Sequence, residues 1–333
     1  MKIRVGTFNL FQFVEPPFSW YTKKEKFNTE QWMQKTTWIK NQITEMNCDI
    51  IGFQEVFSKK ALKTLLDELG FKYFKTIDSP RIDKKNELVY TSTIVALASK
   101  YPIKNLKKVE IDFSALKKHH LNGFFKFARE PIKATITLAN QKELDIYVCH
   151  LKSNRDNEFE YVFTKDSTLN EKKEKVKKAL EENYSISLKQ RLCEASSIFS
   201  DISRTKNPAI LMTDLNDKEF SITIEALSNK KYHNENLIKD DYLMLDAYYH
   251  FDKKIYNPHP EQKEIKRTPT SYFAGKGNVL DYIFVSSLFD KNKKNNIGKI
   301  TSYEVFDKHL QKNQNGSLLN SDHSQVVCEL EFN

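Results

Sequence analysis

Six short segments of the chain carry a carboxylate, amide or imidazole group at or beside the end of an apolar, strand-like run. In chain order, these side chains are Asn9, Glu55, His150, Asp214 with Asn216, Asp281, and Asp322 with His323. Carboxylate and amide oxygens bind hard cations such as Mg²⁺, and imidazole groups transfer protons near neutral pH. Because sheet proteins place their functional sites at strand ends, these positions are candidates for a site that does such chemistry.

Taken alone, most of these residues also have a purely structural explanation. An Asn or Asp at a strand end commonly forms a turn, and a lone His beside an apolar run is commonly a hydrogen-bonded core residue. Asp281 differs because it lies inside the apolar run Val279–Ser286. Burying a carboxylate is strongly unfavourable unless the group is paired. The sequence therefore predicts that a cation or a protonated His lies against Asp281.

Short apolar strands alternate with amphipathic helices along the whole chain. The predicted strands are Ile3–Asn9, Asp49–Glu55, Ser92–Ser99, Pro131–Leu138, Leu144–Leu151, Pro208–Asp214, Val279–Ser286 and Gln325–Glu331. Apolar residues at helical spacing predict a helix over Thr29–Met46. A second helix is predicted over Lys59–Leu69, capped by Ser58 and ended by Gly70. The polar stretch 158–202 is predicted to be mainly helical.

The composition indicates a folded α/β protein. Hydrophobic residues make up 39% and charged residues 29% of the 333 residues, which excludes a disordered chain. Only 8 Gly and 9 Pro exclude collagen-like and linker-dominated sequences. Because no repeat or linker divides the chain, we expect a single domain over residues 1–333. The net charge of +9 is compatible with a polyanionic partner and equally with simple solubility.

The cysteines and the N-terminus bear on the compartment. Four cysteines without a CxxC pair predict buried free thiols rather than disulfides, namely Cys48, Cys149, Cys193 and Cys328. No run approaches the roughly 20 apolar residues that a membrane span needs. The first residues lack the apolar region of a signal peptide, so the sequence as numbered predicts a cytoplasmic protein. If a leader was removed before this numbering began, the protein is secreted.

Taken together and in this order, the six segments resemble the endonuclease/exonuclease/phosphatase superfamily, which has the deoxyribonuclease I-like fold. The pattern is a first strand ending in Asn, "QE" after an apolar strand, a mid-chain strand-end His, D-x-N, "LDY" and a C-terminal "SDH". The resemblance spans Asn9 to His323 and is closest to bacterial nuclease-type members. It implies a four-layer α/β sandwich of two packed mixed β-sheets flanked by helices, with the segment 158–202 as a helical insertion.

The resemblance implies phosphate ester hydrolysis assisted by a divalent metal ion. Glu55 corresponds to the principal metal ligand of the family, and Asn9 and Asp322 lie close to it in the family's sites. The ion implied is Mg²⁺, with Mn²⁺ or Ca²⁺ as alternatives, because hard oxygen ligands suit such cations. Whether one or two metal ions bind is left open by the sequence.

The resemblance also implies how protons are moved. Asp281 pairs with His323 and fixes its tautomer, and His150 contacts the scissile phosphate and serves as a possible acid for the leaving group. Asp214 orients or deprotonates the attacking water, and Asn216 donates a hydrogen bond to a phosphoryl oxygen. Either His323 or Asp214 is the base, and the sequence does not decide between them.

The substrate class is less constrained. Arg129, in the aromatic-x-Arg-x-Pro run Phe127–Pro131, is expected either to clamp a phosphate oxygen or to form a surface ion pair. We expect a nuclease acting on DNA or RNA as a monomer; the alternatives are a sphingomyelinase-like lipid phosphodiesterase and a catalytically silent binding protein. The aromatic-rich stretch Phe11–Tyr21 covers the sheet, stacks bases or enters a membrane.

Overall fold

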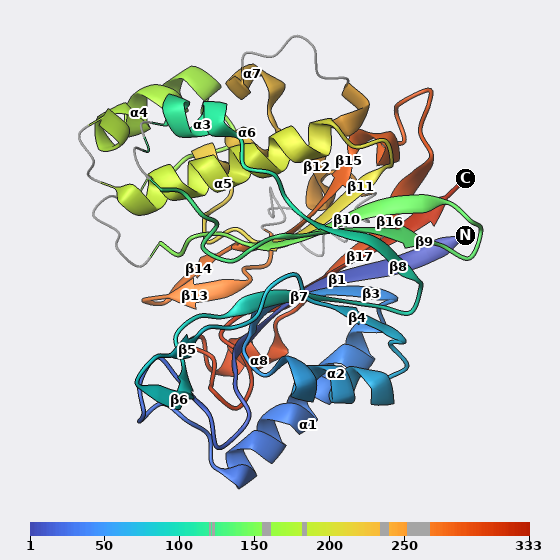
Figure 1. Cartoon of the computed structure of the whole chain (residues 1–333). Coiled ribbons are helices and arrows are strands. Elements are labelled where there is room, and N and C mark those ends of the chain that lie inside the picture. Colours follow the sequence, from blue (N-terminus) through green and yellow to red (C-terminus); the bar gives the residue numbers. More distant parts are fainter. Residues whose placement is uncertain (120, 122–123, 155–160, 182–184, 234–239, 252–266) are drawn as a thin grey trace, which may run out of the picture.

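Two six-stranded mixed sheets pack face to face and carry helices on their outer faces (Figure 1). The computed structural model describes all residues except 120, 122–123, 155–160, 182–184, 234–239 and 252–266. The strand order is β16-β17-β1-β3-β7-β4 in the first sheet and β12-β15-β11-β10-β9-β8 in the second. This arrangement is the predicted four-layer α/β sandwich.

The strands of the two large sheets contain the predicted ones and several more. The first sheet comprises β1 Lys2–Phe13, β3 Ile50–Val56, β4 Tyr73–Lys75, β7 Ile94–Ser99, β16 Gly298–Phe306 and β17 Gln325–Phe332. The second comprises β8 Ile103–Lys108, β9 Ile132–Thr137, β10 Glu143–His150, β11 Ala209–Asp214, β12 Met244–Asp246 and β15 Asp281–Ser286. Two small sheets add β2 Ser19–Trp20, β5 Ile82–Asp83, β6 Asn86–Tyr90, β13 Ser271–Phe273 and β14 Lys276–Asn278.

The helices form the outer layers. They are α1 Thr29–Met46, α2 Lys59–Glu68, α3 Phe113–Lys118, α4 Leu169–Glu181, α5 Ile186–Ser203, α6 Ile222–Ser228, α7 Lys230–His233 and α8 Lys308–Lys312. Figure 1 shows α1 and α2 beneath the first sheet and α3 to α7 above the second. Helical structure is thus found at α4 and α5 within 158–202, although residues 158–160 and 182–184 lie outside the described part.

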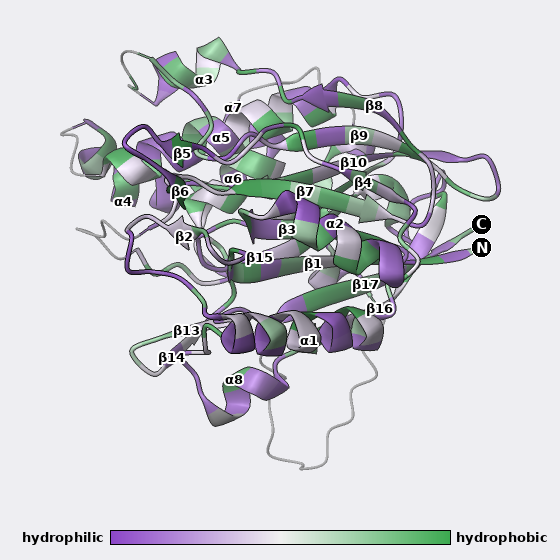
Figure 2. Ribbon diagram, turned by 60° about the horizontal axis from the view of Figure 1, so that its bottom comes forward, coloured by the Kyte–Doolittle hydropathy of each residue, from purple (hydrophilic) through white to green (hydrophobic). Residues whose placement is uncertain are grey.

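The apolar core has one layer between the sheets and one beneath each group of helices. Figure 2 shows β7 and β17 largely hydrophobic, whereas α1 alternates hydrophilic and hydrophobic turns, as expected for a helix with one buried face. The sheets approach closely at Gly52, where an added Cβ would lie 3.0 Å from side-chain atoms of Met212 and Val148. Glycine at this position therefore sets the spacing between β3 and the second sheet.

Several local predictions are decided by the structure. All four cysteines are free and buried, as predicted. Gly70, with φ +83°, follows the C-terminal end of α2. The predicted Ser58 cap is wrong, because the Ser58 hydroxyl accepts a hydrogen bond from the Glu15 amide at 2.8 Å and none from α2. No helix in the described part of the chain is long and apolar enough to cross a bilayer.

The aromatic-rich stretch after Asn9 mainly covers the first sheet. Phe13 and Trp20 are buried, and the ring of Phe13 packs against Trp32 of α1 with ring centroids 4.8 Å apart. Tyr21 is the exception, because 43% of its surface is exposed. Covering the sheet is therefore the role of most of this stretch, whereas Tyr21 packs against Phe57 with part of its ring exposed.

Candidate active site

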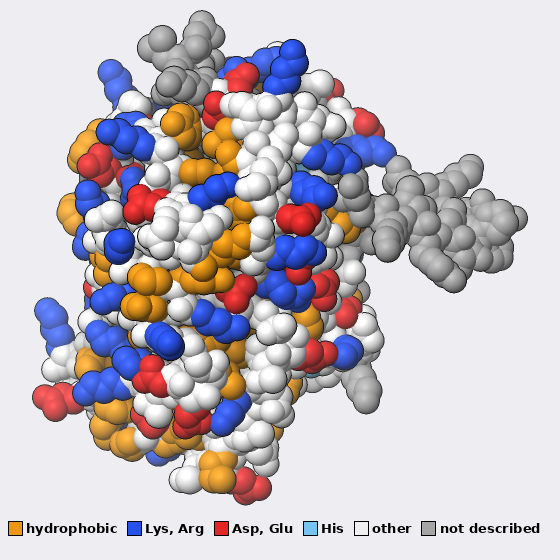
Figure 3. Space-filling view, turned by 90° about the vertical axis from the view of Figure 1, so that its right-hand side faces the viewer, with side chains coloured by type: hydrophobic (Ala, Val, Ile, Leu, Met, Phe, Trp, Pro, Cys, Tyr) orange, Lys and Arg blue, Asp and Glu red, His pale blue; other side chains and the backbone are white. Residues whose placement is uncertain are grey.

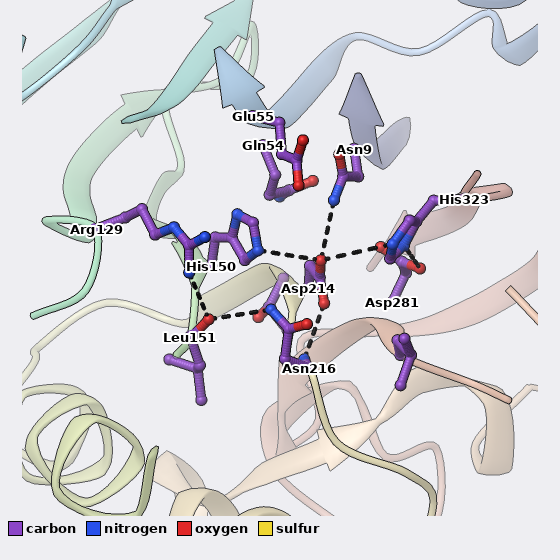
Figure 4. A network of polar contacts seen from close by, with 12 residues as sticks. Asn9, Gln54, Glu55, Arg129, His150, Leu151, Asp214, Asn216, Asp281 and His323 are labelled. Atoms are coloured by element: carbon purple, nitrogen blue, oxygen red, sulfur yellow. Dashed lines mark hydrogen bonds and ion pairs between the residues drawn. The ribbon is translucent and has the colours of Figure 1, made fainter. Parts of the chain in front are cut away.

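The sheet topology brings the predicted residues to one edge of the sandwich. β1 and β3 are parallel, as are β10 and β11, so the carboxyl ends of each pair lie together. β15 and β17 run antiparallel to their neighbours β11 and β1 and therefore begin at the edge where those strands end. Across three adjacent strands, His150 is in register with Asp214, and Asp214 with Asp281. Segments far apart in the chain thus meet at a single place (Figure 4).

Asp214 is the centre of the polar network. Its Oδ2 accepts a hydrogen bond from Nδ2 of Asn9 at 3.0 Å and lies 3.3 Å from Nε2 of His150, and its Oδ1 accepts from the backbone amide of Asn216 at 2.8 Å. The Asn216 side chain donates to the carbonyl oxygen of Leu151 at 3.1 Å. Since Asn9 belongs to the first sheet and Asp214 to the second, their hydrogen bond joins the two sheets at the site.

His323 is held between two carboxylates. Its Nδ1 lies 2.8 Å from Oδ2 of Asp281 and its Nε2 lies 4.0 Å from Oδ2 of Asp214. Asp281 is completely buried, so the partner predicted for this carboxylate is found, and it is His323. The hydroxyl of Ser321 accepts a hydrogen bond from the His323 amide at 3.0 Å and donates one to the Asn9 carbonyl at 2.8 Å. These bonds hold the segment that carries His323 against β1.

Burial and neighbouring charges have opposing effects on the pKa values of His323 and Asp214. Burial lowers the pKa of His323, but the carboxylates of Asp281 and Asp214 outweigh burial and hold that pKa well above its ordinary value. Burial raises the pKa of Asp214; the charge of His323 opposes this rise and the charge of Asp281 adds to it. Perturbed pKa values at neighbouring buried groups are typical of sites that carry out acid–base chemistry.

Glu55 lies on a backbone irregularity at the end of β3. Its φ of +58° is uncommon for a residue other than glycine, and the β1–β3 ladder shifts register here. One carboxylate oxygen accepts from the amide of Gln12 at 3.1 Å, and Gln12 itself has φ +62°. Strained backbone that recurs on both strands at a polar site is typical of functional positions.

The residues around Glu55 fit a divalent cation. Burial raises the pKa of Asp322; the charge of His323 opposes this rise and the charge of Glu55 adds to it. Oδ1 of Asp322 is buried and has no hydrogen-bond partner among the described residues. Asn9 lies beside them, although its side chain is engaged by Asp214 and by the amide of Phe11. Glu55 and Asp322 would supply the hard oxygen ligands that Mg²⁺ prefers.

A second group of potential ligands is better explained by hydrogen bonding. One ligand atom each of Asp214, Asp281 and His323 lie within 4.8 Å of one another, which is close enough to hold an ion. However, Nδ1 of His323 is already bound to Asp281. The closeness of Asp281 and His323 is therefore explained by this hydrogen bond.

Lys35 is a functional candidate that the sequence analysis missed. This fully buried side chain of α1 donates three hydrogen bonds of 2.8–2.9 Å to the carbonyl oxygens of Phe11, Leu318 and Asn320. It thereby ties the C-terminal part of β1 to the loop that carries Asp322. Burial lowers the pKa of Lys35 to about 7, against the opposing charges of Asp322 and Glu55. Its position on the buried face of α1, four residues before Ile39, was the signal in the sequence.

Glu194 of α5, also missed, supports the segments that carry Arg129 and His150. Its two carboxylate oxygens accept hydrogen bonds from the amides of Ala128 at 2.7 Å and Lys152 at 2.8 Å. Burial raises the pKa of Glu194, and these amides oppose the rise. Arg129 donates to the carbonyl of Leu151 at 3.0 Å and forms no ion pair with a described residue, so the surface ion pair is not found.

Comparison with known proteins agrees with this geometry. Residues 6–292 match the sequence pattern of the Endonuclease/Exonuclease/phosphatase family. The chain belongs to this family. No curated protein matches it in sequence. Members of the family are hydrolases of phosphoester bonds and generally use divalent metal ions.

Solved structures share the fold at low sequence identity. The human Nocturnin catalytic domain with bound sulfate is 15% identical, with TM-score 0.59 and coverage of 100% of this chain and 95% of that one. D. rerio TDP2 complexed with a single-strand DNA product is 10% identical, with TM-score 0.55 and coverage of 99% of both chains. An AP endonuclease from Archaeoglobus fulgidus is 12% identical, with TM-score 0.52 and the same coverage. The fold of this family member is therefore the deoxyribonuclease I-like fold.

Proposed function

We propose that the protein is a divalent-metal-dependent phosphodiesterase that cleaves DNA or RNA. The observation that carries the proposal is the buried network of His150, Asp214 and His323. Beside it, Oδ1 of Asp322 lies 4.0 Å from Nε2 of His323 and is buried without a hydrogen-bond partner among the described residues. Hydrolysis of a phosphodiester needs a water to be activated, charge on the phosphoryl oxygens to be neutralised and the leaving oxygen to be protonated. The network supplies the proton transfers, and the ion bound by Glu55 and Asp322 would supply charge neutralisation.

Each residue has a proposed role that its contacts support. Asp281 orients His323, so that Nε2 of His323 faces Asp214. His323 and Asp214 together take the proton of the attacking water, and His150, with Nε2 3.3 Å from Asp214, donates to the leaving oxygen.

The phosphate group is proposed to be held by residues at the rim of this network. Asn216 and Arg129 both donate to the Leu151 carbonyl, which places an amide and a guanidinium beside His150 for contact with phosphoryl oxygens. Asn9 remains proposed as a metal-site residue, and the structure adds that it holds Asp214 in place.

An activity panel tests the proposal. Bis(4-nitrophenyl) phosphate, single- and double-stranded DNA, RNA, abasic DNA and sphingomyelin are incubated with Mg²⁺, Mn²⁺, Ca²⁺ or EDTA. We expect metal-dependent cleavage of nucleic acid that Glu55→Ala or His323→Ala abolishes, while circular dichroism shows an intact fold. Glu68→Ala, which alters an exposed carboxylate of α2, is the control and keeps activity. Full activity of both site variants would refute the assignment.

A lipid phosphodiesterase is the second candidate, favoured by one observation. Phe273 at the end of β13 is 79% exposed, and Figure 1 shows the β13–β14 hairpin projecting from the sandwich. An exposed aromatic ring on a hairpin is suited to a membrane interface. Release of phosphocholine from sphingomyelin vesicles without cleavage of nucleic acid would favour this candidate over a nuclease.

A further inference from the structure

A pocket of about 480 Å³ lies beside the candidate active site and reaches it through Arg129 and Lys152. Its walls come from both halves of the sandwich: Tyr21 and Arg81 from the first half, and Phe124 and Gln190 from the second. The volume is in the range that accommodates a nucleotide-sized group. Of the residues that line this pocket, the proposed mechanism uses only Arg129.

The pocket is strongly cationic. Four of its lining residues are basic, namely Arg81, Lys126, Arg129 and Lys152, and no described lining residue is acidic. None of the four forms an ion pair with a described carboxylate. Elsewhere the surface differs: on the face that carries the termini, Lys and Arg side chains are interspersed with Asp and Glu (Figure 3). The buried Glu194 behind the pocket acts on Arg129, but the other three cations form no ion pair with a described carboxylate. Their positive charge favours an anionic occupant that extends away from the site.

Exposed aromatic rings lie among these cations. Phe124 is 91% exposed and Tyr21 is 43% exposed, although both are large apolar surfaces. Beneath Phe124, the rings of Phe125 and Phe127 are buried and pack edge to face with centroids 5.6 Å apart, which anchors the segment. Aromatic platforms interleaved with basic side chains are the means by which proteins hold unpaired nucleotides, with bases stacked and phosphates paired to cations.

We propose that this pocket binds the single-stranded nucleic acid segment next to the cleaved phosphate, and this rests on the proposed nuclease function. Tyr21 and Phe124 stack on bases, which requires that the bases are unpaired. Arg81 and Lys126 pair with the phosphates beyond the one that Arg129 contacts. A zwitterionic choline headgroup fits less well, because its cation needs an aromatic cage or a carboxylate rather than four positive charges.

Fluorescence anisotropy with a labelled decathymidylate tests the pocket, in EDTA so that the probe is not cleaved. Arg81→Ala/Lys126→Ala is expected to weaken binding at least tenfold and to reduce the slope of log K against log salt by about 1.4, since each phosphate contact on a single strand contributes about 0.7. Phe124→Ala is expected to weaken binding by about five- to 100-fold without changing that slope. Lys104→Ala/Lys107→Ala, on exposed β8, removes the same charge and is expected to bind as the wild type.

The outcomes separate this inference from the proposed function. Wild-type affinity in both pocket variants overturns the pocket assignment, even if bis(4-nitrophenyl) phosphate is hydrolysed. The single-strand specificity is overturned if the wild type binds a duplex probe as tightly as the single strand and the pocket variants weaken both probes equally. Loss of binding to anionic phospholipid vesicles, with oligonucleotide binding retained, would assign the pocket to a membrane instead. If no phosphodiester is hydrolysed but the variants lose decathymidylate binding, the pocket stands and the nuclease proposal fails.

Discussion

Replacing Asp281 by Asn tests the proton network most directly. The change preserves the shape of a completely buried side chain and removes its charge, 2.8 Å from Nδ1 of His323. Burial lowers the pKa of His323, and Asp281 is the largest of the charges that raise it. Without Asp281, burial is opposed mainly by Asp214, whose Oδ2 is 4.0 Å from Nε2. The pKa of His323 must therefore fall.

The size of the change follows from the distance. An opposite charge within roughly 4–6 Å shifts a pKa by about one to three units, and each unit corresponds to about 1.36 kcal/mol. We therefore expect Asp281→Asn to lower the pKa of His323 by about one to three units. The raised pKa of His323 contributes stability that is present below its unfolded value of about 6.5 and is lost as pH rises through the folded value. The variant should lose stability mostly at low pH.

The assay is an NMR titration of the imidazole groups of labelled protein from pH 5 to 10 in EDTA. In parallel, kcat for bis(4-nitrophenyl) phosphate is measured against pH with Mg²⁺. If His323 acts as a base, the acid limb of the profile moves to lower pH; if it acts as an acid, the alkaline limb does. Asp166→Asn, an exposed carboxylate, is the control. An unchanged or higher pKa of His323 in the variant would show that Asp281 does not hold the proton.

Three further changes test the metal site and its supports. Loss of a residue that only supports a metal ligand weakens metal binding about 10- to 100-fold, so Glu55→Gln should weaken Mn²⁺ binding in calorimetry by at least this much. An unchanged Mn²⁺ affinity would exclude Glu55 as a ligand. Lys35→Met removes the donor from three part-buried carbonyls and should lower the free energy of unfolding in urea by about 3 kcal/mol. Lys40→Met, on the exposed face of α1, should change it little. Glu194→Gln retains one acceptor for two amides and should raise the KM for oligonucleotides about fivefold or more, with Glu181→Gln as control.

The strands that carry the site could be predicted because the hydrophobic pattern of each strand lies within a few consecutive residues. Each apolar run ends in a polar residue, and period-two or unbroken hydrophobicity identifies it without knowledge of its neighbours. The resemblance supplied the two packed mixed sheets, whereas the order of the strands within them is known only from the structure. Short edge strands such as β4 and β12 have three residues each, too few for a recognisable period.

The supports of the site could not be predicted in the same way because their partners are distant in the chain. Lys35 donates a hydrogen bond to the carbonyl of Leu318, 283 residues away, and no sequence pattern near Leu318 predicts this contact. The Ser58 prediction failed for a related reason: Glu15, 43 residues earlier, competes successfully for the hydroxyl. Local chemistry indicates which groups need partners, and tertiary packing decides which partners they obtain.

The junction between the two sheets explains why this site depends on the whole fold. Asn9 and Asp214 come from different sheets, yet their side chains share a hydrogen bond of 3.0 Å. The same two sheets pack closely at Gly52, where an added Cβ would lie 3.0 Å from side-chain atoms of Met212 and Val148. A hydrogen bond weakens steeply when its geometry departs from this range, whereas apolar contacts tolerate small shifts. The proton network therefore forms only when the core between the sheets is fully packed, so that loss of tight packing removes catalytic geometry before it removes the fold.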